Sequence, residues 1–241
     1  MIELFGHRGA QDEAPESTLS GFRYAASIGL RAVEFDVQRT ADRELVVFHD
    51  ATLDRTTDGS GPVACRTLAE LRAVDARAQF ADWPEPCGIS TLDEVLVVVA
   101  GLDHLLVEIK RDDPEELAWV VPAAIEVIRA HGLAAKVMIS SFDPLALEIA
   151  AEVDPDIRRV INGAWRDPSY PERAVAAGVW GTDFDYRRVG QEFIDWARDH
   201  GLWVIGWPCD SAEDLARLRA YGVDAVGSNL PSSIEELLAS G

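Results

Sequence analysis

The chain has 241 residues, 48% of them hydrophobic, which is enough to bury a sizeable core, and α/β barrels of about this length commonly form one domain. It carries 22 lysines and arginines against 42 aspartates and glutamates, and the net charge of −20 argues against nucleic acid and anionic membranes as partners. The sequence shows no signal peptide and no apolar run of membrane-spanning length, so we expect a cytoplasmic protein with no stable membrane insertion. Its three cysteines show no spacing typical of a zinc site or a disulfide framework, so we expect reduced thiols.

Nine apolar runs of strand length follow one another along the chain. They cover Ile2–Gly6, Ala32–Val37, Leu45–Phe48, Leu105–Ile109, Val137–Ser140, Arg158–Ile161, Val179–Asp183, Leu202–Gly206 and Ala225–Val226. Segments with helical periodicity lie between most of them, at Thr18–Ile28, Leu92–Val99, Pro114–Ala130, Pro144–Glu152, Tyr170–Ala177, Phe193–His200 and Ala212–Ala220. Strands that alternate with helices indicate parallel βα units. The short turn 41–44 predicts that 45–48 is an extra antiparallel arm, and the other eight strands can close into a barrel.

Residues 52–90 interrupt this alternation. They contain Thr-Thr-Asp-Gly-Ser-Gly-Pro and Asp-Trp-Pro-Glu-Pro-Cys-Gly, which is too much turn chemistry for a barrel helix. We therefore expect a small insertion here, after the third strand-like segment, with one short helix near Leu68–Val74. The whole chain, 1–241, is expected to form a single domain.

Two acidic residues alternate with apolar ones in the run 32–37. Because successive side chains of a strand point to opposite faces, Glu34 and Asp36 share one face of the strand. Two carboxylates on one face suit a hard divalent cation. A hairpin folded at 41–44 would set His49 roughly opposite Phe35, between the two carboxylates. A histidine would then border the metal.

Further polar residues lie at or just after the ends of two other apolar runs. Glu108 and Lys110 share one face at the end of 105–109, and His7-Arg8 follows the first run between two glycines, which let the backbone approach a ligand. Together the polar residues supply three oxygen ligands, two acid–base candidates and two cations: Glu34, Asp36, Glu108, His7, His49, Arg8 and Lys110. That inventory favours metal-assisted phosphoester chemistry.

Seven short motifs, taken in order, resemble those of the glycerophosphodiester phosphodiesterase family. They are His7-Arg8-Gly9, Pro15-Glu16-Ser17-Thr18, Glu34-Phe35-Asp36, His49-Asp50, Leu53-Asp54-Arg55-Thr56-Thr57, Glu108-Ile109-Lys110 and Trp207. The resemblance extends from Phe5 to about Pro231, nearly the whole chain. It implies a TIM (β/α)8 barrel and the hydrolysis of a small-molecule glycerophosphodiester, a reaction of lipid metabolism, to glycerol 3-phosphate and an alcohol.

The resemblance also implies roles for particular residues. Glu34, Asp36 and Glu108 would hold a divalent cation, Mg²⁺ or Ca²⁺. His7 and His49 would form the acid–base pair. Which histidine is the acid stays open, as does the choice between water and the glycerol 2-hydroxyl as nucleophile.

The same resemblance implies that the substrate is bound by Arg8, Lys110 and Trp207. Arg8 would bind the phosphate and Lys110 would stabilise charge that develops on it, although Lys110 could instead only neutralise Glu108. Trp207 would stack on the glycerol or headgroup, or only close the top of the barrel. The remaining histidines have no motif residues beside them in the sequence and are predicted to be structural: His104, His131 and His200.

The chain departs from the usual motifs at three places. Ser17 replaces an asparagine of Pro-Glu-Asn-Thr, the usual Trp-Thr-Val-Asn reads Trp-Pro-Cys-Asp at 207–210, and the usual Thr-Asp reads Ser-Asn at 228–229. None removes a predicted metal ligand or either catalytic histidine, but the last two border the barrel mouth and leave the headgroup open. Asp50 is expected to orient a neighbouring histidine, and Arg55 to organise the insertion.

Two other functions remain as alternatives. Another metal-dependent TIM-barrel enzyme acting on a phosphorylated small molecule would also use carboxylates and a lysine, but it has no need of the His-Arg-Gly and His-Asp pair. A non-catalytic glycerophosphodiester-binding protein would keep the barrel and lose an acid–base histidine, and both histidines are present here. Oligomeric state is left open by the sequence.

Overall fold

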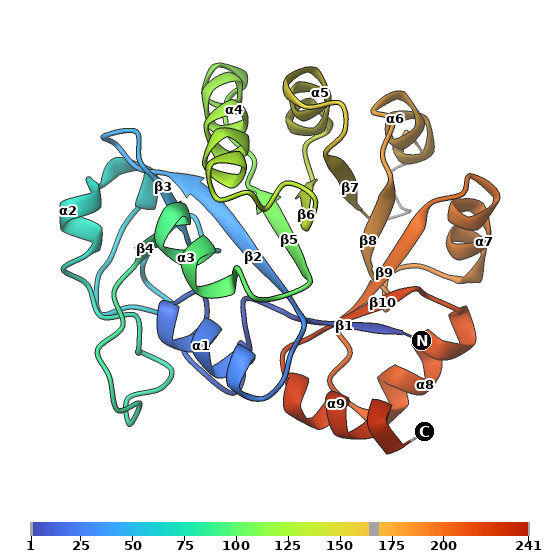
Figure 1. The fold of residues 1–241 in the computed structure, drawn as a ribbon, viewed down its shortest axis with the longest axis horizontal. Coiled ribbons are helices and arrows are strands. Elements are labelled where there is room, and N and C mark those ends of the chain that lie inside the picture. The colour runs from blue at the N-terminus through green and yellow to red at the C-terminus, as the bar shows by residue number, and fades with distance from the viewer. Residues whose placement is uncertain (1, 164–168, 241) are drawn as a thin grey trace.

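The computed structural model of the protein describes residues 2–163 and 169–240, and in them eight parallel strands form a closed barrel (Figure 1). The strands are β1 (Glu3–Gly6), β2 (Ala32–Arg39), β5 (His104–Ile109), β6 (Val137–Ser141), β7 (Arg158–Gly163), β8 (Gly181–Asp185), β9 (Trp203–Trp207) and β10 (Ala225–Ser228). Closure comes from β1, which pairs in parallel with both β10 and β2. The predicted TIM barrel is confirmed.

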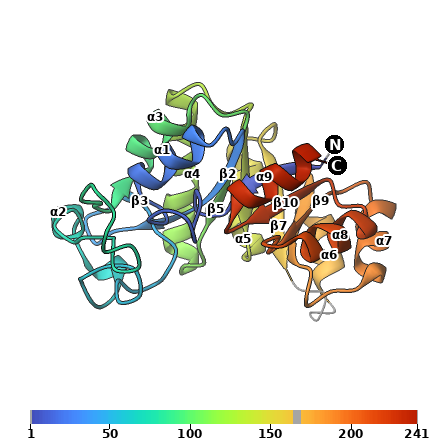
Figure 2. The same ribbon diagram turned by 90° about the horizontal axis from the view of Figure 1, so that it is seen from below.

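Helices surround the barrel and cover the outer face of its strands (Figures 1 and 2). They are α1 (Leu19–Ser27), α3 (Leu92–Val99), α4 (Pro114–Ala130), α5 (Pro144–Val153), α6 (Tyr170–Ala176), α7 (Gln191–Asp199), α8 (Ala212–Tyr221) and α9 (Pro231–Ser240). Side chains cap several of these helices at their N-termini: the Thr18 side chain accepts from the backbone N–H of Gly21, and Thr91 forms a capping box with Glu94. The last helix, α9, was not among the predicted elements.

The antiparallel arm predicted from the turn at 41–44 is confirmed. Strand β3 (Leu45–Val47) runs antiparallel to β2, with Val47 opposite Val37. The same register extrapolates to position 49 opposite Phe35, as the hairpin argument expected. A two-residue strand that the sequence did not reveal, β4 (Ser90–Thr91), pairs with the other edge of β3.

Between β3 and β4 the chain forms a lobe on one side of the barrel, at the left of Figure 1, with the short helices η1 (Val63–Cys65) and α2 (Leu68–Leu71). The helix expected near 68–74 is therefore present but shorter, and a capping box between Thr67 and Glu70 sets its start. The lobe has a small apolar core of its own: Val46, Phe48, Leu53, Val63, Leu71 and Ile89.

The barrel interior consists of an apolar layer with a polar layer above it. The apolar layer contains Phe5, Ala32, Leu106, Met138, Val160, Ile205 and Ala225. Because side chains on one face of a strand recur every second residue, the next inward positions lie one layer closer to the carboxyl ends of the strands. Those positions are His7, Glu34, Glu108, Ser140, Asn162, Trp207 and Gly227. The alternation thus places the chemistry at one end of the barrel.

Across residues 2–163 and 169–240, no helix combines the length and apolar character needed to cross a membrane.

Candidate active site

The carboxyl ends of the barrel strands surround a cavity, at the position where TIM-barrel enzymes carry their active sites. Most of the predicted site residues line it: His7, Arg8, Glu34, Asp36, His49, Glu108 and Trp207. Lys110 joins them through its ammonium group, which reaches Asp36 and Glu108. Residues from both ends of the chain therefore meet at one place.

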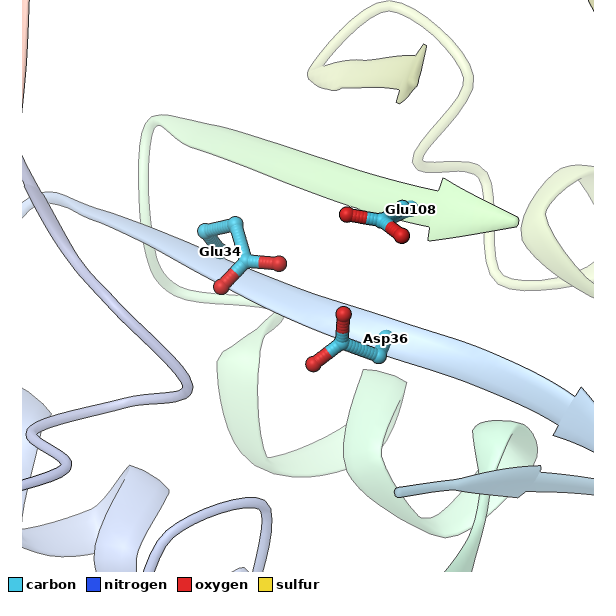
Figure 3. A group of neighbouring side chains, drawn as sticks. All are labelled: Glu34, Asp36 and Glu108. Carbon is cyan, nitrogen blue, oxygen red and sulfur yellow. The ribbon is translucent and has the colours of Figure 1, made fainter. Parts of the chain in front are cut away.

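Three carboxylates form the centre of this site. Glu34 and Asp36 lie on β2, and Glu108 lies on β5 directly opposite Asp36. One oxygen from each residue lies within 4.8 Å of the others, and Figure 3 shows the three groups gathered over the two strands. Their exposures are only 8%, 1% and 7% in that order. Buried carboxylate oxygens at this spacing are a suitable donor set for a hard divalent cation.

Burial and mutual repulsion govern the ionisation of these carboxylates. Burial and the neighbouring carboxylates raise the pKa of Glu34 well above its ordinary value. Burial and the charge of Asp36 raise the pKa of Glu108 from 4.5 to about 7. Burial opposes ionisation of Asp36 too, but the ammonium of Lys110 and other nearby cationic groups outweigh it and lower the pKa of Asp36. Added positive charge would therefore release protons from this cluster.

Two cations touch the carboxylates. Lys110 Nζ lies 2.7 Å from Asp36 Oδ1 and 2.7 Å from Glu108 Oε1, so it neutralises both residues. Arg8 Nε lies 3.6 Å from Asp36 Oδ2, and the backbone N–H of Arg8 donates to Glu34 Oε2 at 3.0 Å. Asp36 Oδ2 accepts no hydrogen bond from the described residues. It is therefore available to a further ligand.

The ring of His7 is oriented by the far end of the chain. Its Nδ1 lies 2.6 Å from Asn229 Oδ1, while Asn229 Nδ2 donates to Asp210 Oδ2 at 3.0 Å. Because the amide nitrogen is used by Asp210, the amide oxygen faces the ring and Nδ1 bears the proton. The lone pair is then on Nε2, which lies 3.8 Å from Glu34 Oε2. Burial and the charge of Arg8 lower the pKa of His7 to about 4, which keeps the ring neutral near pH 7.

His49 is oriented in the same way by its neighbour. Its Nδ1 lies 2.6 Å from Asp50 Oδ1. Burial opposes ionisation of Asp50, but hydrogen bonds from Arg55 and His49 outweigh it and lower the pKa of Asp50 to about 2, so Asp50 is an acceptor and His49 Nδ1 bears the proton. Burial also lowers the pKa of His49. Both cavity histidines therefore carry the lone pair on Nε2, the form in which an imidazole can take up a proton.

The turn that carries His7 and Arg8 is tightly packed. A Cβ atom on Gly6 would lie 2.0 Å from the carbonyl oxygen of Gly9 and 2.7 Å from Leu30 Cδ1, and Arg8 adopts a φ of 50°. We expect Gly6→Ala to lower the free energy of unfolding by about 1–3 kcal/mol or more, because a backbone oxygen has to move. It should also lower activity by shifting His7.

Urea unfolding measures this effect. Gly101→Ala is the control, because a Cβ atom there would meet nothing within 4 Å. Its free energy of unfolding should stay within about 0.5 kcal/mol of the wild-type value. Equal unfolding midpoints for the two variants would show that the turn is not as constrained as its geometry indicates.

Trp207 and several residues without a motif complete the cavity. The Trp207 ring lies nearly parallel to that of His7, with centroids 6.4 Å apart and an interplanar angle of 16°. Asn162 and Asp183, side by side on β7 and β8, also line the cavity, and Asn162 Nδ2 donates to Glu108 Oε2 at 3.0 Å. Burial raises the pKa of Asp183 well above its ordinary value. The sequence analysis did not identify either residue. Each is a polar residue at an inward position near the carboxyl end of its strand, and that pattern could have identified both as cavity residues.

The other histidines lie outside the cavity lining and bind nearby groups. His104 Nδ1 pairs with Glu3, His131 Nε2 lies 2.8 Å from Asp93 Oδ1, and His200 Nδ1 lies 2.8 Å from the carbonyl oxygen of Trp196. These contacts match the structural role predicted for them.

The protein is a closed (β/α)8 barrel. The carboxyl ends of its strands carry carboxylates, cations and two proton-accepting histidines, and this arrangement defines a TIM-barrel enzyme. Comparison with known proteins identifies the family. The model of the glycerophosphoryl diester phosphodiesterase family matches residues 7–233. The chain therefore belongs to that family and is a phosphoric diester hydrolase, which confirms the resemblance seen in its motifs.

Individual relatives are similar to the chain over most of their lengths. The chain is 29% identical to a glycerophosphodiester phosphodiesterase of Caldanaerobacter subterraneus subsp. tengcongensis, over 99% of this chain and 98% of that one. It is 30% identical to one of Bacillus subtilis, over 95% and 84% of the two chains. Among solved structures, an Oleispira antarctica phosphodiesterase in complex with the product sn-glycerol-3-phosphate superposes with a TM-score of 0.91 at 28% identity, covering 99% of this chain and 97% of the other.

Proposed function

We propose that the protein hydrolyses glycerophosphodiesters to glycerol 3-phosphate and an alcohol in the cavity at the carboxyl ends of its strands. The observation that carries this proposal is the cluster of Glu34, Asp36 and Glu108 beside two histidines whose Nε2 atoms bear lone pairs. The similarity to a phosphodiesterase with bound sn-glycerol-3-phosphate supports the choice of substrate.

The donor set favours a divalent cation at Glu34, Asp36 and Glu108. Three buried carboxylates within 4.8 Å of one another repel, and Lys110 with Arg8 balances only part of their charge. Oxygen ligands are those that Mg²⁺ and Ca²⁺ prefer, and we propose one of these as the cofactor. When bound, such an ion supplies positive charge that polarises the phosphate and stabilises its additional charge during the reaction.

The protein's own groups would bind and orient the substrate around this position. Arg8 offers its guanidinium to a phosphate oxygen, and Lys110 adds a second positive charge near the same place. Trp207, beside His7 in the cavity wall, would pack against the glycerol or the headgroup. These substrate-binding roles follow from placement and family resemblance.

His7 and His49 would move the protons. One of them takes a proton from the nucleophile through Nε2. The other must first be protonated on Nε2, as an imidazolium, and gives that proton to the leaving alcohol. Their Nδ1 atoms are engaged by Asn229 and Asp50, so only Nε2 of each ring is available for this exchange. Water and the glycerol 2-hydroxyl, the latter through a cyclic phosphate, both remain candidates for the nucleophile.

We further propose that residues 1–241 form a single domain with an insertion at about 52–90. The pairing of β3 with β2 and the contacts of Arg55 with Glu16 and Asp50 join the lobe to the barrel and support this description. The cytoplasmic location expected from the sequence stays a prediction.

The ionisation of Glu108 and Glu34 leads to a prediction about pH. In metal-free protein their pKa values lie above those of the unfolded chain, so the folded state holds protons that the unfolded state releases. Their contribution to stability is present below pH 4.5 and is lost as the pH rises towards 7. A divalent cation should therefore raise the melting temperature more strongly at pH 7 than at pH 5.

Thermal unfolding at several pH values, with chelator or with added Mg²⁺ or Ca²⁺, measures this difference. Glu108→Gln is the matched variant, because it removes one of the titrating groups and should flatten the pH dependence. A cation effect on melting temperature that is equal at pH 5 and pH 7 would argue against a metal bound by these carboxylates.

The direct test of the proposed function is an assay of purified protein on glycerophosphocholine, glycerophosphoethanolamine and glycerophosphoglycerol. We expect glycerol 3-phosphate from at least one of the three. Absence of hydrolysis with all three, in the presence of Mg²⁺ or Ca²⁺, would contradict the proposal.

A further inference from the structure

Arg55 lies in the lobe between β3 and β4 and makes contacts that sequence reasoning did not foresee. Its guanidinium donates four hydrogen bonds to two carboxylates: Nη1 and Nη2 reach Glu16 at 2.7 and 2.8 Å, and Nε and Nη2 reach Asp50 at 2.6 and 3.0 Å. Both carboxylates are bound in the two-pronged manner that fixes their orientation. Arg55 thus connects the loop after β1 with the segment after β3.

Each of these carboxylates holds a residue of the cavity. Glu16 Oε1 accepts a hydrogen bond from Arg8 Nη1 at 3.0 Å, and Asp50 Oδ1 lies 2.6 Å from His49 Nδ1. The Glu16 side chain is only 4% exposed, so it is not free to turn elsewhere. Arg55 itself is not among the residues that line the cavity.

We propose that Arg55 is a positioning residue that fixes Arg8 and His49 relative to each other. It acts through Glu16 on the guanidinium of Arg8 and through Asp50 on the imidazole of His49. The inference rests on the proposed function, in which Arg8 binds the phosphate and His49 exchanges a proton.

The electrostatics of the bridge agree with this role. Burial favours the neutral form of Glu16, yet hydrogen bonds from Arg55 and the charge of Arg8 keep the pKa of Glu16 below its ordinary value. Glu16 therefore remains a charged acceptor for both arginines. Isolated pairs on a protein surface contribute little, but a forked arginine shared by two carboxylates, one of them buried, forms a network that restrains geometry.

A lysine cannot replace this arginine. Its ammonium is a single point charge on a flexible stem, without the planar fork that binds two carboxylates at once. We therefore expect both Arg55→Met and Arg55→Lys to lower kcat on a glycerophosphodiester by roughly 10–100-fold, the scale of loss caused by about 1 Å of misplacement. The value of KM should change less than kcat.

Arg77→Met is the matched control. Arg77 lies in the same lobe and binds Asp75 and the carbonyl oxygen of Trp83, away from the cavity. If Arg55 only stabilised the lobe, the two methionine variants would lose similar activity for a similar drop in melting temperature. We expect Arg77→Met to keep a kcat within about threefold of wild type. An equal loss of kcat in both variants would overturn the proposal.

A double-mutant cycle tests the route through Asp50. Because Arg55 acts partly through Asp50, the loss of kcat caused by Arg55→Met should be at least about threefold smaller in an Asp50→Asn background than in wild type. An equal loss in both backgrounds would overturn this route.

Nitrogen-15 NMR of the histidine rings gives a readout that needs no substrate. We expect His49 to carry its proton on Nδ1 in wild type and Arg77→Met, and to mix its two tautomers in Arg55→Met. An unchanged tautomer together with wild-type kcat in Arg55→Met would disprove the proposal. If wild type itself failed to hydrolyse glycerophosphodiesters, the proposed function would fail, and the tautomer measurement would still decide whether Arg55 positions His49.

Discussion

His7→Ala and His49→Ala should each lower kcat on a natural glycerophosphodiester by roughly 10²–10⁴-fold, the usual contribution of a positioned acid or base. Both rings have Nδ1 engaged, by Asn229 and Asp50, so that Nε2 of each is the group available for proton transfer. Steady-state kinetics measures the effect, and circular dichroism shows whether the variants remain folded.

Controls and a second substrate make this prediction sharper. His131→Ala and His200→Ala should change kcat little, because these rings bind Asp93 and the carbonyl oxygen of Trp196 outside the cavity. A nitrophenyl ester, whose leaving group departs without protonation, should restore turnover to the variant that lost the general acid. The variant that it restores identifies that acid. Near-wild-type turnover of a natural substrate by either cavity variant would refute the two-histidine mechanism.

Removal of divalent cations should abolish activity, and Mg²⁺ or Ca²⁺ should restore it. The reason is the charge of the site: three carboxylates, Glu34, Asp36 and Glu108, would face an anionic phosphodiester, and among the described residues Arg8 and Lys110 are the cations that contact them. Activity after dialysis against chelator, followed by titration with each metal, measures this dependence.

Variants link the metal effect to these carboxylates. Asp36→Asn should weaken activation by the cation, whereas Asp93→Asn, on the surface beside His131, should not. Full turnover in excess chelator by protein shown to be metal-free would remove the cation from the mechanism.

Much of the barrel follows from local sequence patterns. Alternation of Glu34 and Asp36 with apolar neighbours on β2 predicts an inward acidic face, and the short turn at 41–44 predicts the antiparallel arm that leads to His49. Both features depend on strand periodicity and turn length, which are properties of a few consecutive residues.

Other elements depend on tertiary contacts and were missed or displaced. Strand β8 was expected to begin at Val179, but it begins at Gly181, because Gly178 adopts a φ of 55° after α6 and Val179 packs into the core between helices and strands. Helix α9 was overlooked, although Ile234, Leu237 and Leu238 recur at helical spacing and Ile234 is fully buried. β4 has two residues, too few for any periodicity.

The supporting contacts of the site were the least predictable. His7 and Asn229 are 222 residues apart and meet only because the barrel closes between β1 and β10. Glu16 was visible as part of a motif, but its position between Arg8 and Arg55 depends on how the lobe folds against the barrel. Such contacts arise from chain topology rather than from spacing within one element.

Phosphorus-31 NMR of a reaction with glycerophosphocholine tests the central claim most directly, because it shows which ester bond breaks. We predict that the diester signal is replaced by that of glycerol 3-phosphate in wild type, either directly or after a transient cyclic phosphate, and that it persists in Glu108→Gln. Formation of phosphocholine instead, or undiminished conversion by Glu108→Gln, would contradict the account of this site as a carboxylate-dependent glycerophosphodiesterase centre.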